Sequence, residues 1–96
     1  MTKENLEIYQ ELYTKSQLKR MKVVDEYLNT FGEMIKKKAI SPNSAFEALA
    51  RKYELSKIGV RYMLEKAGVY KNKTEPLYYP TEAERAAKPT YFFSVV

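Results

Sequence analysis

The chain contains no cysteine and no histidine. Disulfide bonds, zinc sites built from these residues, and the usual pairs of general base and nucleophile are therefore excluded. Aspartate is also scarce, because Asp25 is the only one, and no acidic cluster has the spacing of a divalent-metal site. A nucleophilic tyrosine of the recombinase or relaxase type would need histidine or arginine partners in a larger scaffold. We therefore expect a protein that is not an enzyme and that needs no cofactor or metal.

Long apolar stretches are missing as well. No run approaches the roughly 20 apolar residues of a membrane-spanning helix. Residues 1–10, MTKENLEIYQ, lack the apolar centre of a signal peptide. These observations predict a cytoplasmic protein with no membrane partner. The 96 residues, of which 45% are hydrophobic, suffice for one small domain with a modest core, which a second copy could help to complete.

Basic side chains are concentrated in the middle of the sequence. Residues 1–35 contain five basic and six acidic side chains, residues 36–73 contain ten and three, and residues 74–96 contain two and three. The middle segment alone therefore has a net charge of +7, and each flanking segment has −1. Such a patch attracts phosphates and makes binding salt-dependent. Lysines that merely keep a small domain soluble would be spread more evenly.

The basic segment contains two short amphipathic patterns between Ser44 and Gly68. Apolar side chains recur at helical spacing, pause at residues 54–55, and then resume. They are Phe46, Leu49, Ala50, Tyr53, Val60, Met63, Leu64 and Ala67. Gly68 follows the second run and supplies the left-handed residue that commonly ends a helix. The pattern predicts two short helices joined by a tight turn.

The start of each helix has its own signal. Ser44 and Glu47 have the spacing of a capping box, which predicts that the first helix begins at about Ala45. Residues 41–43 then form the turn that leads into it, because proline cannot continue a helix. Ser56 stands directly before the second apolar run and can accept a hydrogen bond from an exposed N–H group, which predicts a second helix at residues 57–67.

Part of this stretch shows a more specific pattern, formed by Leu49-Ala50, Tyr53, Leu55-Ser56, Val60-Arg61 and Met63-Leu64. It resembles the helix-turn-helix of bacterial and phage repressors and of the DNA-binding domains of resolvases and invertases. The resemblance covers about a quarter of the chain. It implies that the two helices cross closely at Ala50, that Leu55 and Val60 fill the core between them, and that Ser56 opens the recognition helix.

Glu54 departs from the family pattern, in which glycine is commonest at this position. Glycine adopts a positive φ without a Cβ clash. A glutamate at the same place therefore predicts modest backbone strain or a slightly different turn.

A second helix that buries Val60, Met63 and Leu64 points its remaining side chains away from the core. A hydroxyl, cations, a tyrosine and an aliphatic side chain make a surface suited to a DNA groove. The residues predicted to contact DNA from this face are Ser56, Lys57, Ile58, Arg61, Tyr62 and Glu65. Flanking lysines are predicted to contact phosphates, namely Lys36, Lys37, Lys38, Lys71 and Lys73. Pairs of amphipathic helices also occur in bundles that touch no nucleic acid, and the apolar spacing fits both.

An apolar stripe precedes the motif, and its members are spaced three or four residues apart. Its members are Leu18, Met21, Val24, Leu28, Phe31 and Ile35. They predict a helix of about 20 residues, which would be the first of a three-helix domain spanning residues 18–68. Residues 1–17 are predicted to form an N-terminal helical extension, with a short helix at residues 6–13. Thr14 and Gln17 have capping-box spacing, so a new helix can start there.

The predicted C-terminal region, residues 69–96, begins with β-prone runs around a polar turn. A hairpin here would form a wing with Lys71 and Lys73 at its tip, whereas Pro76 favours an edge strand or a plain loop. Both arrangements, a short hairpin and an extended tail, fit the sequence.

A capping box at Thr81 and Glu84 predicts a short helix at residues 82–88, stopped by Pro89. The last stretch, residues 91–96, is uncharged, aromatic and β-prone. Left exposed it would promote aggregation, so we expect it to pack on this domain, on a second copy, or on another protein. The tail and the Leu18–Ile35 stripe are the two segments through which we expect self-association.

Together these patterns predict a mainly α-helical protein that binds double-stranded DNA sequence-specifically, as a homodimer. The expected role is that of a small transcriptional regulator such as a repressor, or of an accessory DNA-binding protein of a phage or plasmid-like element. An alternative is a protein–protein interaction module or inhibitor that uses the same helical scaffold. The thirteen aromatic residues fit that alternative, because tyrosine and phenylalanine are favoured at interfaces.

Overall fold

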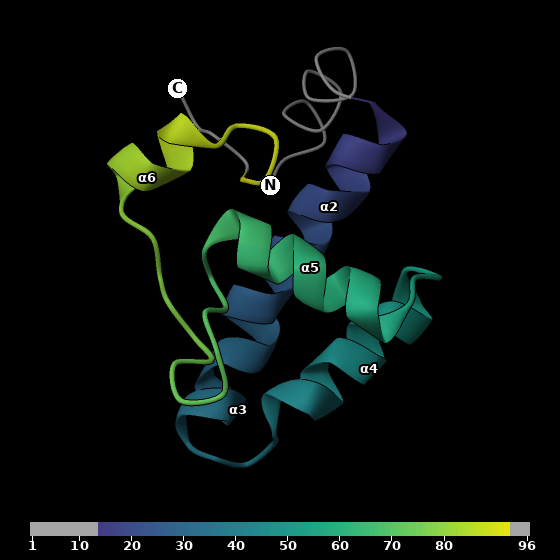
Figure 1. The fold of residues 1–96 in the computed structure, drawn as a ribbon, viewed down its shortest axis with the longest axis vertical. Coiled ribbons are helices and arrows are strands. Elements are labelled where there is room, and N and C mark those ends of the chain that lie inside the picture. The colour runs from purple at the N-terminus through teal and green to yellow at the C-terminus, as the bar shows by residue number, and fades with distance from the viewer. Residues whose placement is uncertain (1–13, 93–96) are drawn as a thin grey trace.

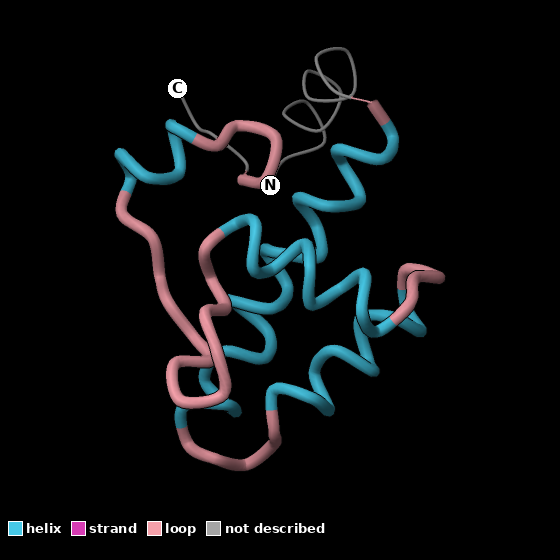
Figure 2. The backbone as a smooth tube through the Cα atoms, in the orientation of Figure 1, coloured by secondary structure: helices cyan, strands magenta, loops and turns pink. Residues whose placement is uncertain are grey.

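The computed structural model describes residues 14–92, which form a mainly α-helical fold with no strand in that range (Figure 1; Figure 2). The predicted short helix at residues 6–13 and the end of the tail, residues 93–96, lie outside this range. The elements are α2 (Lys15–Glu26), the π-helical segment η1 (Tyr27–Phe31), α3 (Gly32–Lys36), α4 (Pro42–Lys52), α5 (Lys57–Ala67) and α6 (Glu82–Ala87). None of the helices among these residues is long and apolar enough to cross a membrane.

The first three elements form one continuous helical run over residues 15–36. Its start is the predicted capping box, in which the Gln17 N–H donates to the Thr14 hydroxyl at 3.2 Å and the Thr14 N–H donates to the Gln17 side chain at 2.9 Å. The apolar stripe faces the interior of this same domain, and Leu28 is only 2% exposed. The stripe, through which we expected self-association, is therefore covered by the domain itself except at the partly buried Phe31.

The π-helical segment η1 interrupts the run, which the apolar spacing did not predict. The hydroxyl of Tyr79 donates to the backbone carbonyl of Leu28 at 3.2 Å, within this segment. Gly32 leaves room for that hydroxyl, which would collide with a Cβ at the same position. The widened turn and the glycine therefore let the chain after α5 pack closely against the first helix.

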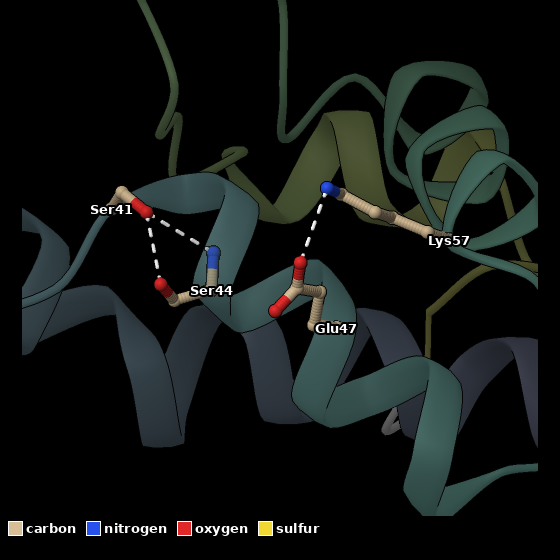
Figure 3. Close-up of polar contacts among 4 residues, drawn as sticks. All are labelled: Ser41, Ser44, Glu47 and Lys57. Carbon is tan, nitrogen blue, oxygen red and sulfur yellow. Dashed lines mark hydrogen bonds and ion pairs between the residues drawn. The ribbon is translucent and has the colours of Figure 1, made fainter.

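Helix α4 begins earlier than predicted. Ser41, not Ser44, is its N-cap residue, and the Ser41 hydroxyl accepts a hydrogen bond from the Ser44 N–H at 3.1 Å (Figure 3). Pro42 occupies the first helical position. Its fixed φ suits that position and its missing N–H costs nothing there. Proline therefore opens the helix, and its prediction as part of the preceding turn is wrong.

Helix α5 has the bounds that the sequence predicted. The Ser56 hydroxyl accepts from the Gly59 N–H at 3.0 Å, and Gly68 ends the helix with a φ of +81°. In the turn between α4 and α5, Glu54 has a φ of +55°. This is the left-handed region that non-glycine residues rarely adopt, so Glu54 has the positive φ for which glycine is the commoner residue.

The core lies where α5 crosses the long first helix and packs against α4 (Figure 1). Val60 and Leu64 of α5 are completely buried. The Phe46 ring of α4 lies 5.9 Å from the Tyr27 ring and makes an edge-on contact with the Tyr70 ring at 5.1 Å. Tyr70 follows α5, so residues beyond Gly68 belong to the same core as residues 18–68.

The chain after α5 doubles back without forming strands, so the alternative of a β-hairpin wing is wrong. The Lys71 N–H donates to the Glu75 carbonyl at 3.1 Å, and the Tyr78 N–H donates to the Val69 carbonyl at 2.9 Å. Between these bonds, the Asn72 side chain accepts from the N–H groups of two following residues, at 2.9 and 2.8 Å. Pro76, which has no N–H, limits further pairing. The result is a tight loop beside α3, visible in Figure 2.

The chain then runs along the domain to α6, which starts with the predicted Thr81–Glu84 capping box and ends at Ala87, one residue short of the predicted end. No residue of α6 is buried. The residues after α6 anchor this helix, because Phe92 enters the core and is 3% exposed. Arg20 on α2 also lies over the Tyr91 ring at 4.4 Å. The described part of the tail therefore packs on its own domain.

This packing predicts a large stability difference between two aromatic truncations. Phe92→Ala should lower the free energy of unfolding by about 3 kcal/mol, since it leaves a cavity in the core. The matched variant Tyr62→Ala removes a ring that is 58% exposed, and should change stability by less than about 0.5 kcal/mol. Urea denaturation followed by circular dichroism measures both values. Equal stability of Phe92→Ala and wild type would show that the tail is not anchored in the core.

Candidate nucleic-acid interface

The exposed side of α5 presents the side chains that the sequence predicted. Each residue turns an α-helix by about 100°, so burial of Val60 and Leu64 directs Ile58 and Tyr62 to the opposite side. Ile58 is 72% exposed and Tyr62 is 58% exposed. Arg61 and Glu65 are exposed beside them. The predicted outward projection is confirmed, while contact with DNA stays a prediction.

The charged residues of this face form exposed ion pairs, which a ligand could replace with little loss of free energy. Arg61 pairs with Glu65 one turn later, with 3.4 Å between Nε and Oε1. Lys57 reaches from α5 to Glu47 on α4, with 3.4 Å between Nζ and Oε1 (Figure 3). Exposed pairs of this kind contribute about 0–1 kcal/mol. Ser56 differs from the others, because its hydroxyl is already engaged as the N-cap of α5.

A groove of about 600 Å³ opens beside the N-terminal half of α5. The start of α4, the first turns of α5 and the loop after α5 surround it. Its lining residues are Ser41, Pro42, Asn43, Phe46, Lys57, Ile58, Arg61, Tyr70 and Lys73. Phe46 and Tyr70 are buried, whereas Lys73 and Arg61 are exposed. The groove therefore combines an aromatic floor with cationic edges.

A second hollow adjoins this groove, because Ser41, Pro42 and Lys73 line both. Lys38, in the turn after α3, lines the second hollow. The structure thereby brings Lys38 and Lys73 into one row with Lys57 and Arg61, although these four residues come from three separate parts of the sequence. We call this row the basic track.

The other predicted lysines lie elsewhere. The Lys36 ammonium lies 5.1 Å from the centre of the Tyr79 ring and 3.9 Å from the Glu33 carboxylate. The Lys71 ammonium lies 4.9 Å from the centre of the Tyr78 ring, whose hydroxyl donates to the Glu84 carboxylate of α6. Lys37 is exposed at the end of α3 and lines neither hollow of the basic track. The structure therefore places Lys38 and Lys73 in the two hollows beside α5. Lys36 lines a third hollow, which shares Ile35, Thr74 and Pro76 with the second, while Lys37 and Lys71 line none of the three.

Sequence reasoning missed the first turn of α4 as part of this surface. Ser41 and Asn43 line the groove, but the capping-box spacing predicted a helix start at about Ala45. The signal was present in the serine–proline pair, because serine is a favoured N-cap residue and proline a favoured first helical residue.

A partly buried contact network orients the other end of α4. Both the Lys52 ammonium and the Tyr53 hydroxyl donate to the Glu26 carboxylate of α2, the latter at 2.6 Å. Burial favours the neutral form of Glu26, but these hydrogen bonds outweigh it and hold the pKa of the carboxyl below its ordinary value. Burial, together with the bond to Glu26, raises the pKa of Tyr53. The network fixes α4, and with it the turn into α5, against the first helix.

Comparison of the chain with protein-family models, with curated proteins and with solved structures finds no match. The geometry of the chain itself therefore provides the basis for a functional proposal.

The division among the lysines predicts different effects of two neighbouring substitutions. Lys73→Gln should weaken binding to all duplex DNA sequences alike and reduce the slope of log K against log salt by about one unit. Lys71→Gln, two residues away, should leave the slope unchanged because that ammonium lies outside the basic track. Fluorescence anisotropy with a labelled duplex at several salt concentrations measures both slopes. A larger change in Lys71→Gln than in Lys73→Gln would contradict the placement of the track.

Proposed function

We propose that the chain is a helix-turn-helix protein that binds double-stranded DNA sequence-specifically. The observation that supports this most directly is the exposed face of α5, which combines cationic, aromatic and aliphatic side chains beside the basic track. In the proposal, α2 to α3 form the first helix of a three-helix domain, α4 the second, and α5 the recognition helix. The segment after α5 contributes Val69, Tyr70 and Phe92 to the core of the same domain.

The dimensions and charges of this surface suit a DNA duplex. The major groove is about 12 Å wide and admits one α-helix. Helix α5 has eleven residues, so it spans about 16 Å at a rise of 1.5 Å per residue. With α5 in the groove, the basic track along its edge would face the neighbouring phosphates. Arg61 would contact base edges, and Lys57, Lys38 and Lys73 would contact the backbone.

The start of α4 fits a phosphate-facing position in the same arrangement. In helix-turn-helix complexes the helix before the recognition helix crosses the DNA backbone. Here the first turn of α4 lines the groove together with Lys57 and Lys73. We therefore propose that residues 41–43 approach a phosphate next to the site that α5 reads.

One recognition helix makes a small interface, so we propose that two copies occupy a site with two half-sites about 34 Å apart. The Leu18–Ile35 stripe and Phe92 are buried in the domain itself. Phe31 and Tyr91 are partly buried, so within residues 14–92 these two predicted segments offer little free apolar surface for the homodimer. The proposed role is transcriptional regulation, for example as a repressor, or an accessory DNA-binding role on a phage or plasmid-like element.

The alternative of a protein–protein interaction module loses part of its support. It drew on the number of aromatic residues, but two that the tail could have offered to a partner are engaged, since Phe92 packs in the core and Tyr91 packs against Arg20. The exposed face of α5 is flanked by cations, which fits a polyanion better than an apolar partner surface.

Selection of bound sites from random duplex DNA tests this function. The wild type should enrich one motif, and Arg61→Ala should lose about 1 to 3 kcal/mol of binding free energy and relax the preference at one position of that motif. Arg51→Ala is the matched control, since Arg51 is exposed on α4 and lines neither hollow of the basic track. It should keep the full motif.

Two results would overturn the proposal. The first is a wild-type selection that enriches no sequence. The second is an Arg61→Ala variant that is folded by circular dichroism yet keeps both the affinity and the motif of the wild type. That second result would remove α5 from the role of recognition helix.

A further inference from the structure

Ile58 and Tyr62 are the most exposed large hydrophobic side chains among residues 14–92, at 72% and 58% exposure. They lie one helical turn apart on α5, so their side chains are neighbours on its surface. Both point directly away from the buried Val60. This places a small apolar patch at the centre of the surface that would enter a DNA groove.

Charged groups surround this apolar patch on both sides. Arg61 and Glu65 form their ion pair along one edge. The Lys66 ammonium lies 5.3 Å from the centre of the Tyr62 ring on the other edge. One cation therefore stands on each side of the apolar centre, Arg61 with its partner Glu65 on one side and Lys66 on the other. This arrangement is complementary to a ligand that has apolar groups between two rows of negative charge. The major groove of duplex DNA has this arrangement, with a phosphate backbone along each side.

The apolar group that the base edges expose in the major groove is the C5-methyl group of thymine. Successive side chains at i and i+4 are displaced by about 6 Å along a helix axis. Successive base pairs are displaced by about 3.4 Å. Two side chains so spaced can therefore meet methyl groups about two base pairs apart.

We propose that Ile58 and Tyr62 select thymine at two positions of the half-site by packing against its methyl groups. The inference rests on the proposed DNA binding and adds the base identity that this part of α5 recognises. Arg61 lies between Ile58 and Tyr62 in sequence, but it belongs to the basic track, along one edge of α5. It would read a different base from a different edge of the helix.

Replacing thymine by deoxyuridine tests the inference, because the two bases differ only in the methyl group. Each thymine of the selected site is replaced in turn and the affinity of the wild-type protein is measured by fluorescence anisotropy. With two half-sites, four of these duplexes, two for each half-site, should bind about fourfold more weakly, the effect expected for one buried methyl group at about 0.8 kcal/mol. Replacement of thymines elsewhere in the site should have no effect.

Protein variants then assign each methyl group to a side chain. Ile58→Ala should lose the sensitivity to deoxyuridine at one of the two positions and Tyr62→Ala at the other. Tyr78→Ala is the control, because this exposed ring lies in the loop beyond α5, and it should keep both effects. All three side chains are at the surface, so the variants should remain folded.

The outcomes separate this inference from the function on which it rests. A wild type that binds its selected site but is insensitive to every deoxyuridine replacement overturns the thymine selection and leaves the DNA binding intact. A sensitivity that persists unchanged in both alanine variants also overturns it. Selection of no DNA motif at all would overturn both proposals together.

Discussion

The burial of one side of α5 determines how the rest of this surface is arranged. Val60 and Leu64 are completely enclosed between the first helix and α4. Once these two side chains are buried, the helical period fixes the direction in which every other side chain of α5 leaves the helix. Ile58, Arg61 and Tyr62 therefore point outward from a rigid platform. A loop could present the same side chains, but it would have to lose conformational entropy when it bound a ligand.

Several independent contacts hold the elements around α5 in place. The Phe46 ring connects the first helix to the chain that follows α5. The Glu26 carboxylate connects α2 to the end of α4. Ser41 and Ser56 cap the helices at the two places where the chain enters the groove. The basic track depends on all of these contacts, because its lysines come from segments distant in sequence.

Local signals in the sequence predicted the helix boundaries well. The capping boxes at Thr14 and Thr81, the N-cap at Ser56 and the end at Gly68 all depend on side chains next to the backbone groups that they satisfy. Such signals do not require knowledge of the tertiary structure. Pro42 is the exception, because proline has opposite effects inside a helix and at its first position.

Features that depend on tertiary packing could not be predicted in the same way. The spacing of Leu28 and its neighbours showed which side of the first helix is apolar, but not what covers it. The apolar character of the tail indicated that it packs on this domain, on a second copy or on another protein, and only the fold shows that Phe92 completes the core of its own domain. Lys71 and Lys73 are two residues apart and chemically identical, yet they lie on different sides of one loop. Their separation follows from the Asn72 turn, a contact that the composition of the loop did not specify.

An NMR titration of the 15N-labelled protein with a duplex that contains its selected site tests the central claim most directly. The account predicts that the largest changes in amide chemical shift occur in the N-terminal half of α5, at Ser41 and Asn43 and around Lys73. Helix α6 and the neighbourhood of Lys71 should change little. Changes concentrated on α6, or no change at any ratio of DNA to protein, would contradict the assignment of α5 and the basic track as a DNA-binding surface.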